Sequence, residues 1–531
     1  MKVLLKNGLI VDGSGKAGFR GDVLIEDALI RSVSHVPIIV EACKTIDCSG
    51  KVVAPGFIDA HSHNDRAVCL KNDLPYLEPF IRQGITTFVA GNCGRSVVGS
   101  ERNRLFLWET PDDEDTKVWE TYHEYFDHVR KHGIRQNMVL LAGHETAHIS
   151  VMGNKPIIRT PLEQRKKIER VLEEGLDAGC KGISFGLGYS VCKMMDDEEI
   201  REISELAIKR NAVISIHSRT LNVSLPQFYG DDYSEPHNIR WHREFFERFR
   251  DSGAKLQVAH LVFMGSAAWP TFDRFFEMFD TYMNHKGIDL WFDMYNYTQG
   301  TADIGLLLTP YFYKNIDDIY DNPDKIRTLQ KEMQESFHLK GYDPSLMQVC
   351  NGYSMKYKKY QGQFFPEVEK KTGMSVTDLI MDIYRESGGA GTIYTLFDQK
   401  EEDINIQMTH PHALYATDGW YEPSTHQNAC TYGAMPKYLH LARESGNITI
   451  EECVAHMTGM TADRYNMHGR GYLRDGYFAD IVVFNPKTVT TKATFENPDI
   501  YPIGIEHVFV NGGHLFDDGK LNTEIRSGYI V

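Results

Sequence analysis

The sequence predicts an α/β fold, a (β/α)8 TIM-type barrel with a small β-sandwich domain formed by both chain termini. Short apolar runs alternate with amphipathic helical stretches through the middle of the chain, as they do in a parallel sheet or barrel. Runs typical of β-strands occur at both ends. Most of the central runs end in a residue that can bind a metal, and in a parallel barrel such residues meet at one mouth.

The two ends of the chain are predicted to form one small domain. Apolar runs separated by turn-forming residues fill residues 1–52, and similar runs return at 479–484 and 505–510. We therefore assign 1–54 and 468–531 to the β-sandwich domain and 55–467 to the barrel. The same pattern is compatible with two separate β-flaps, one at each end.

Helices and one long insertion are expected between the barrel strands. The clearest helix is 161–179, whose apolar residues recur on one face. The stretch between the last two strands far exceeds a usual loop, so residues about 298–410 should carry helices of their own and cover the mouth as a lid. A smaller insertion is expected near 227–240. The eight expected strands are 53–60, 86–92, 138–144, 182–187, 213–216, 256–259, 288–293 and 413–417.

Composition excludes several classes of partner. The 531-residue chain has a net charge of −16, which argues against nucleic acid and anionic membrane surfaces. No stretch approaches the ~20 apolar residues that span a bilayer, and the first residues lack a signal-peptide core. The nine cysteines are scattered without a CxxC pair, which favours free thiols in the cytoplasm. We expect a small-molecule substrate, and a homo-oligomer is compatible with the sequence.

Residue types that bind metals follow five of the expected strands. Any one of them would be weak evidence, because a lone buried cysteine or histidine is more often a core residue. Together, histidine, thiolate and carboxylate are the ligands of zinc or a similar borderline metal. The ordered series therefore predicts a metal-dependent hydrolase, in which Asp418 either binds metal or accepts the proton of water. In chain order the candidates are His61, His63, Cys93, His217, His260 and Asp418.

Several motifs resemble the amidohydrolase superfamily, and more narrowly its D-aminoacylase (N-acyl-D-amino-acid deacylase) branch. They are Pro-Gly-Phe-Ile-Asp-x-His-x-His at 55–63, Gly-Asn-Cys-Gly at 91–94 and Thr-Asp-Gly at 417–419, with further matches at 182–189, 293–297, 457–462 and 469–484. The resemblance covers nearly the whole chain. It implies one zinc held mainly by Cys93, His217 and His260. It also implies a second, weaker site at the two histidines after the first strand and at Asp418, which would be the general base.

Three positions depart from the pattern of that branch. Where the branch carries Arg, Lys and Arg, this chain has His148, Val262 and Asn428. Cations at such positions are natural partners of a substrate carboxylate, so their loss favours a substrate whose recognised end is neutral or aromatic. A carboxylate held elsewhere, for example by Arg219, is the alternative, although Arg219 could equally be a structural ion-pair partner. The candidate substrate contacts are His144, Tyr189, Arg219, Tyr295 and His426.

Three functions are compatible with these residues. The first is a zinc-dependent hydrolase of an amide-type C–N bond, with an N-acyl-D-amino acid as the default substrate. The second is the same machinery acting on a neutral or cyclic amide, a carbamate or a formamide. The third is a catalytically silent scaffold, against which the intact ligand set speaks. Metal content discriminates the third function, and a substrate panel separates the first two.

Overall fold

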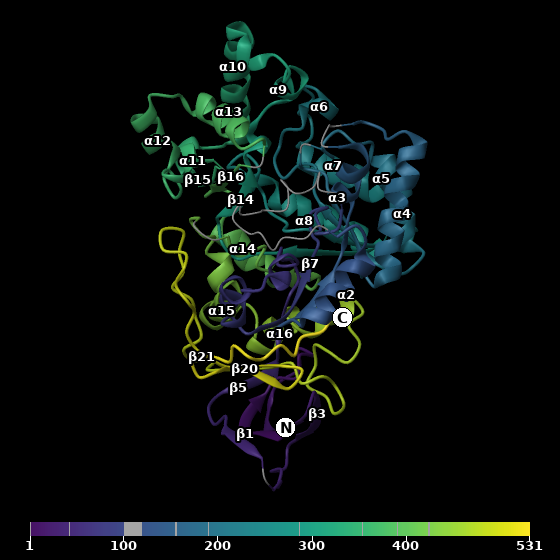
Figure 1. Cartoon of the computed structure of the whole chain (residues 1–531), viewed down its shortest axis with the longest axis vertical. Helices are drawn as coiled ribbons and strands as arrows, with labels where there is room; N and C mark the ends of the chain where they lie inside the picture. Colours follow the sequence, from purple (N-terminus) through teal and green to yellow (C-terminus); the bar gives the residue numbers. More distant parts are fainter. Residues whose placement is uncertain are drawn as a thin grey trace.

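A computed structural model describes residues 2–41, 43–99, 119–153, 157–189, 191–285, 287–352, 354–389, 391–422 and 425–531. The molecule has three regions along its long axis (Figure 1). A β-sheet that contains strands from both chain ends lies at one end, the barrel lies in the middle, and a largely helical insertion lies at the other end. No helix in the described ranges is long and apolar enough to cross a membrane.

The predicted parallel barrel is confirmed. Its strands form two hydrogen-bonded groups, β6-β7-β8 and β9-β10-β11-β12-β13-β17, and every pairing within them is parallel. The Lys181 N–H, just before β10, donates to the Leu140 carbonyl of β8, and the Ala60 N–H, just after β6, donates to the Tyr415 carbonyl of β17, which joins the groups into a ring. The strands are β6 Phe57–Asp59, β7 Ile85–Ala90, β8 Asn137–Leu140, β9 Ala142–Gly143, β10 Gly182–Gly186, β11 Val213–His217, β12 Lys255–Val258, β13 Asp289–Met294 and β17 Ala413–Tyr415.

The first expected strand, 53–60, is divided between two sheets, so the prediction of one barrel strand was wrong there. Residues Val52–Pro55 form β5, which pairs with strands of the terminal sheet, and β6 follows it in the barrel. Gly56 lies at the division. A Cβ there would lie 2.2 Å from the side chain of Thr86, so the two sheets approach too closely for any other residue. The apolar run is continuous because both halves are buried.

Helices follow the barrel strands as expected. The expected helix 161–179 is confirmed as α4, which buries Ile168, Leu172 and Leu176 and ends before Gly179. The region of the expected smaller insertion contains α6 and the start of α7. The helices are α1 Leu74–Ile81, α2 Tyr122–His132, α3 His144–Met152, α4 Leu162–Ala178, α5 Asp197–Ile208, α6 Pro226–Tyr229, α7 His237–Glu247, α8 Phe272–His285, α15 Cys430–Ser445, α16 Ile450–His456 and α17 Gly459–Arg464, with 3-10 turns at Ala67–Cys69 and Trp269–Thr271.

Strands from both chain ends form one continuous sheet, so the alternative of two separate flaps was wrong. β5 pairs with β1 on one side and with β18 on the other. The sheet curls until Ile30 exchanges backbone hydrogen bonds with Gly476 and Tyr477, just before β18. Its other strands are β1 Lys2–Ile10, β2 Phe19–Glu26, β3 Leu29–Ser34, β4 Lys44–Asp47, β18 Ile481–Phe484, β19 Ile505–Val510, β20 Gly513–Asp517 and β21 Lys520–Leu521.

The insertion between β13 and β17 is built around a second apolar core of residues such as Leu329, Met333 and Ile393, to which Met264 of the loop after β12 also belongs. It contains the expected helices and also a three-stranded antiparallel sheet, which the sequence did not indicate. Its elements are β14 Gly300–Asp303, α9 Pro310–Lys314, α10 Pro323–Lys340, β15 Met347–Asn351, α11 Met355–Lys358, α12 Phe365–Thr372, α13 Val376–Glu386, β16 Thr392–Thr395 and α14 Glu401–Gln407, with 3-10 turns at Ile304–Leu307, Ile319–Asp321 and Pro344–Leu346.

Candidate metal centre

Three candidate histidine ligands surround the Cys93 sulfur at the C-terminal mouth of the barrel. Cys93 Sγ lies 3.4 Å from His61 Nε2, 3.6 Å from His217 Nδ1 and 3.3 Å from His260 Nε2. His217 Nδ1 and His260 Nε2 are themselves 2.7 Å apart. Four strands, β6, β7, β11 and β12, therefore direct one thiol and three imidazoles at one point, as the sequence predicted.

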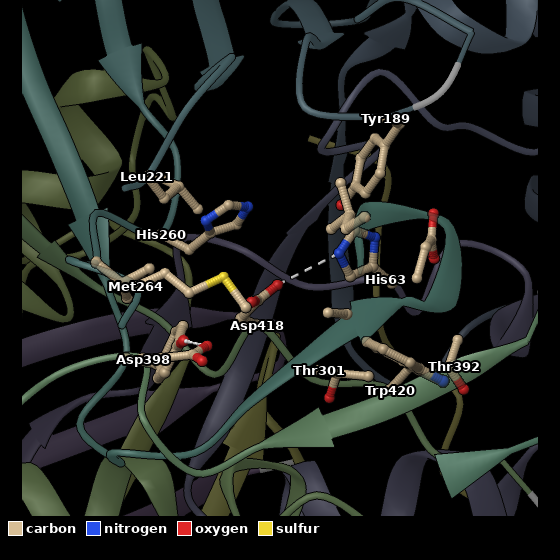
Figure 2. Close-up of a pocket in the computed structure, with 15 residues that line it drawn as sticks. His63, Tyr189, Leu221, His260, Met264, Thr301, Thr392, Asp398, Asp418 and Trp420 are labelled. Atoms are coloured by element: carbon tan, nitrogen blue, oxygen red, sulfur yellow. Dashed lines mark hydrogen bonds and ion pairs between the residues drawn. The ribbon is translucent and has the colours of Figure 1, made fainter. Parts of the chain in front are cut away.

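The remaining two candidates lie beside this group. Asp418 Oδ1 lies 3.3 Å from His61 Nε2 and 3.4 Å from His63 Nε2 (Figure 2 shows the second contact). The ligand atoms of His61, His63 and Asp418 lie within 4.8 Å of one another, and so do those of His61, Cys93 and His260. Because His61 belongs to both groups, two adjacent ions could be accommodated.

Three of these candidate ligands have a backbone conformation that non-glycine residues rarely adopt. The φ angles are 57° at Cys93, 32° at His260 and 48° at Asp418. Such conformations cost roughly 1–3 kcal/mol each and persist where the surrounding structure holds them, commonly at functional sites. Each follows the last residues of a barrel strand, where the left-handed turn redirects the side chain.

Asp293, at the end of β13, holds two of the histidines from outside. Its carboxylate accepts hydrogen bonds from His61 Nδ1 at 2.9 Å, from the His260 backbone N–H at 2.7 Å and from Gln257 Nε2 at 3.0 Å. This contact fixes the tautomer of His61 that leaves Nε2 free to act as a ligand. Asp293 was not among the predicted site residues, although its position at the end of an expected strand could have indicated it.

The electrostatics favour the ligand forms of the thiol and the carboxyl. Burial opposes ionisation of Cys93, yet the nearby His260 and His61 rings hold the pKa of its thiol well below the usual range. Burial also opposes ionisation of Asp418, and the same two rings still leave its pKa lowered. Thiolate, imidazole and carboxylate within bonding reach of one point are a donor set that suits zinc, so the residues present fit such an ion.

A cavity opens between the candidate ligands and the insertion (Figure 2). Tyr189, from the loop after β10, and Tyr295, just after β13, line it, and so does Val262. Among the described residues that line the cavity there is no Arg or Lys. Its lining is His63, Tyr189, Leu221, His260, Val262, Met264, Tyr295, Thr301, Ala302, Asp303, Leu306, Thr392, Asp398, Asp418 and Trp420.

Three of the predicted substrate contacts do not line this cavity. The Arg219 side chain is fully buried in an ion pair with Asp197 at 2.6 Å. This position agrees with the structural ion-pair role that the sequence left open for Arg219. His144 is buried at the start of α3, outside the lining. His426 Nε2 lies 2.8 Å from the Phe495 carbonyl oxygen, also outside the lining.

Sequence reasoning missed a buried ion network behind Tyr189. Arg95 donates to Glu145 at 2.8 Å and to Asp303 at 2.6 Å, and its guanidinium lies 3.9 Å from the centre of the Tyr189 ring. The network connects the loop after β7 to the insertion. Arg95 directly follows the Gly-Asn-Cys-Gly motif, so its place in the sequence could have indicated that it lies near the site. Nothing in the sequence indicated Asp303.

Comparisons with known proteins agree with this architecture. The model of the amidohydrolase family matches residues 44–215 and 412–516. A D-aminoacylase from Alcaligenes xylosoxydans xylosoxydans is 28% identical over 97% of this chain and 94% of its own length. An N-acyl-D-aspartate deacylase from the same organism is 26% identical over 99% and 94%.

Two solved structures share the fold. A crystal structure of D-aminoacylase has a TM-score of 0.79 at 23% identity and covers 99% of both chains. The N-acyl-D-glutamate deacylase from Bordetella bronchiseptica, complexed with zinc and a phosphonate inhibitor, has a TM-score of 0.80 at 24% identity and covers 99% of this chain and 98% of its own. With the family match over more than half of its length, the chain belongs to the amidohydrolase family.

Proposed function

We propose that this protein is a zinc-dependent hydrolase of an amide-type C–N bond in a small molecule. The observation that carries the proposal is the convergence of the Cys93, His217 and His260 donor atoms at the barrel mouth, with Asp418 beside them. These three residues would hold the tighter zinc, and His61, His63 and Asp418 would hold a second, weaker one. A silent scaffold is disfavoured, because it has no need to maintain strained ligand conformations.

In this proposal zinc supplies a Lewis acid and makes water more acidic. Asp418 is the general base: it accepts a proton from the attacking water and then delivers it to the amide nitrogen as the C–N bond breaks. Its side chain is 20% exposed and lines the cavity, so water and substrate can reach it. Asp293 positions His61 without touching the substrate.

The substrate proposed first is an N-acyl-D-amino acid, since relatives at 26–28% identity over nearly the whole chain act on that class. A neutral or cyclic amide is the second candidate. It is favoured by one observation, that Val262 lines a cavity whose described lining has no Arg or Lys. A buried carboxylate without a cation or several hydrogen bonds is costly, so an acid substrate would need polar partners in their place.

A kinetic panel tests both levels of the proposal. Purified protein should contain zinc and hydrolyse N-acyl-D-amino acids, their uncharged α-amides or cyclic imides. Free acids preferred by more than ~10-fold, or about 1.4 kcal/mol, would support the deacylase substrate and exclude the neutral one. Zinc-loaded protein that is inactive on all three classes would contradict hydrolysis of an amide-type bond.

We also propose the chain organisation that the sequence indicated, with 1–54 and 468–531 as one domain and 55–467 as the barrel that carries the insertion. None of the nine cysteines forms a disulfide, which supports a reducing compartment such as the cytoplasm. A homo-oligomer remains a prediction that light scattering would test.

A further inference from the structure

One buried carboxylate in the cavity has no part in the proposed reaction. Asp398 belongs to the insertion and lines the same cavity as His260 and Asp418 (Figure 2). The residue is only 6% exposed. Its oxygens accept hydrogen bonds from the Tyr295 hydroxyl at 2.9 Å and from the Thr395 hydroxyl at 2.5 Å. No Arg or Lys within the described ranges forms an ion pair with it.

The other carboxylates of the lining have partners. Asp303 pairs with Arg95 at 2.6 Å, and Asp418 lies 3.4 Å from His63 among the proposed metal ligands. Asp398 has only neutral hydroxyl donors. Burial raises the pKa of its carboxyl to about 7, although the hydroxyls of Thr395 and Tyr295 and the nearby His260 ring lower it. Asp398 is thus the carboxylate of the described lining that forms no ion pair with a side chain, and a buried charge without such a partner is costly.

The surrounding chain holds Asp398 in place. Tyr295 contacts it from the barrel, and Thr395 contacts it from β16 of the insertion. A Cβ at Gly300 would lie 1.6 Å from Asp398 Oδ2. Any residue other than glycine would therefore clash with the carboxylate at this position of β14. These contacts from three segments pre-organise the carboxylate at the cavity wall, where a ligand can meet it without rearrangement.

We propose that Asp398 is a specificity-determining residue that pairs with a positively charged nitrogen of the substrate. The enzyme then prefers N-acylated amines that carry a primary ammonium or guanidinium group away from the bond that is cleaved. This inference rests on the proposed function of the same cavity. Leu221, Met264 and Leu306, also in the lining, suit the alkyl chain of such a substrate.

The competing explanation is that Asp398 only positions Tyr295. Asp398→Asn separates the two roles, because asparagine keeps the size and an oxygen that accepts a hydrogen bond but removes the charge. A positioning role predicts equal losses for every substrate. A pairing role predicts a loss confined to cationic substrates. Asp317→Asn, the same exchange at an exposed residue of the insertion, is the matched control.

The test compares N-acetyl derivatives of D-lysine, D-norleucine and D-glutamate, each as the free acid and as the α-amide, on zinc-loaded wild type and both variants. We expect kcat/KM for the lysine derivatives to exceed that for norleucine by at least ~10-fold, since a charge-assisted contact in a buried site is worth about this much or more. Asp398→Asn should abolish this preference and change the norleucine values less than ~3-fold. Asp317→Asn should match wild type.

Calorimetric titration with butylamine, butanol and butyrate measures the same preference without turnover. Binding of butylamine alone, lost in Asp398→Asn, supports the inference even if no substrate is hydrolysed, in which case only the proposed function fails. Two results would overturn the inference and leave the proposed function standing. In the first, wild type hydrolyses the norleucine or glutamate derivatives as well as the lysine derivatives. In the second, Asp398→Asn keeps its zinc content but loses the same fraction of activity on all substrates.

Discussion

The barrel mouth and the insertion supply two walls of the same cavity by different means. Candidate metal ligands come from the ends of five barrel strands, and three of them are held in strained backbone conformations. The insertion contributes Thr301, Asp303 and Asp398 from a segment with its own apolar core. Most of this core belongs to the insertion, although Met264 of the loop after β12 is part of it, so we expect the cavity residues of the insertion to vary with little effect on the candidate metal ligands. The difference suggests that chemistry and specificity are encoded in different parts of this chain.

The largest effect is expected when a candidate metal ligand at the barrel mouth is replaced. His260→Ala should lose most bound zinc, and hydrolysis should fall to background, because the tighter site would keep only two of its three ligands. Zinc by mass spectrometry and turnover are measured together. His123→Ala, an exposed histidine that pairs with Glu174, is the matched control. One equivalent of zinc retained by His260→Ala would show that the ligand assignment is wrong.

Asp418→Asn tests whether Asp418, which also lies at the barrel mouth, accepts the proton of the attacking water. The exchange keeps size but removes the base, so kcat should fall by ~10²–10⁴-fold, the usual contribution of a general base. Zinc content should stay near that of wild type. A variant with full zinc and near-normal kcat would leave Asp418 without a catalytic role.

A smaller effect is expected from Asp293, which supports the ligands from outside. Asp293→Asn should weaken zinc binding by ~10–100-fold, as is typical when the hydrogen-bond partner of a ligating histidine is changed. Competition with a fluorescent chelator measures the affinity. Unchanged affinity would mean that the contact to His61 does not orient the ring.

The smallest effect on the metal is expected from the insertion core. Leu329 in α10 and Leu172 in α4 are both fully buried, so alanine at either should cost about 2–5 kcal/mol of stability. Leu329→Ala should raise KM and leave zinc affinity unchanged, while Leu172→Ala should lower the melting temperature of the barrel. Loss of zinc in Leu329→Ala would show that the two walls are not independent.

The same division explains what the sequence could predict. His217 and His260 stand directly after apolar strands of regular spacing, so strand periodicity alone indicates that they meet. Asp398 and Arg95 reach the cavity region through tertiary packing of a long insertion and a loop, which leaves no periodic signal. For Arg219 the sequence left a substrate contact and a structural ion pair open. It stands two residues from His217, yet its guanidinium turns to Asp197 and is buried.

The central claim is that strand-end side chains hold a zinc ion at the barrel mouth. Anomalous X-ray scattering from crystals of the active enzyme, recorded on both sides of the zinc absorption edge, tests it most directly. The account predicts a zinc peak bonded to Cys93 Sγ, His217 Nδ1 and His260 Nε2. An active crystal with no peak there, or with its only zinc at another cluster such as His507, His514 and Asp517, would contradict the account.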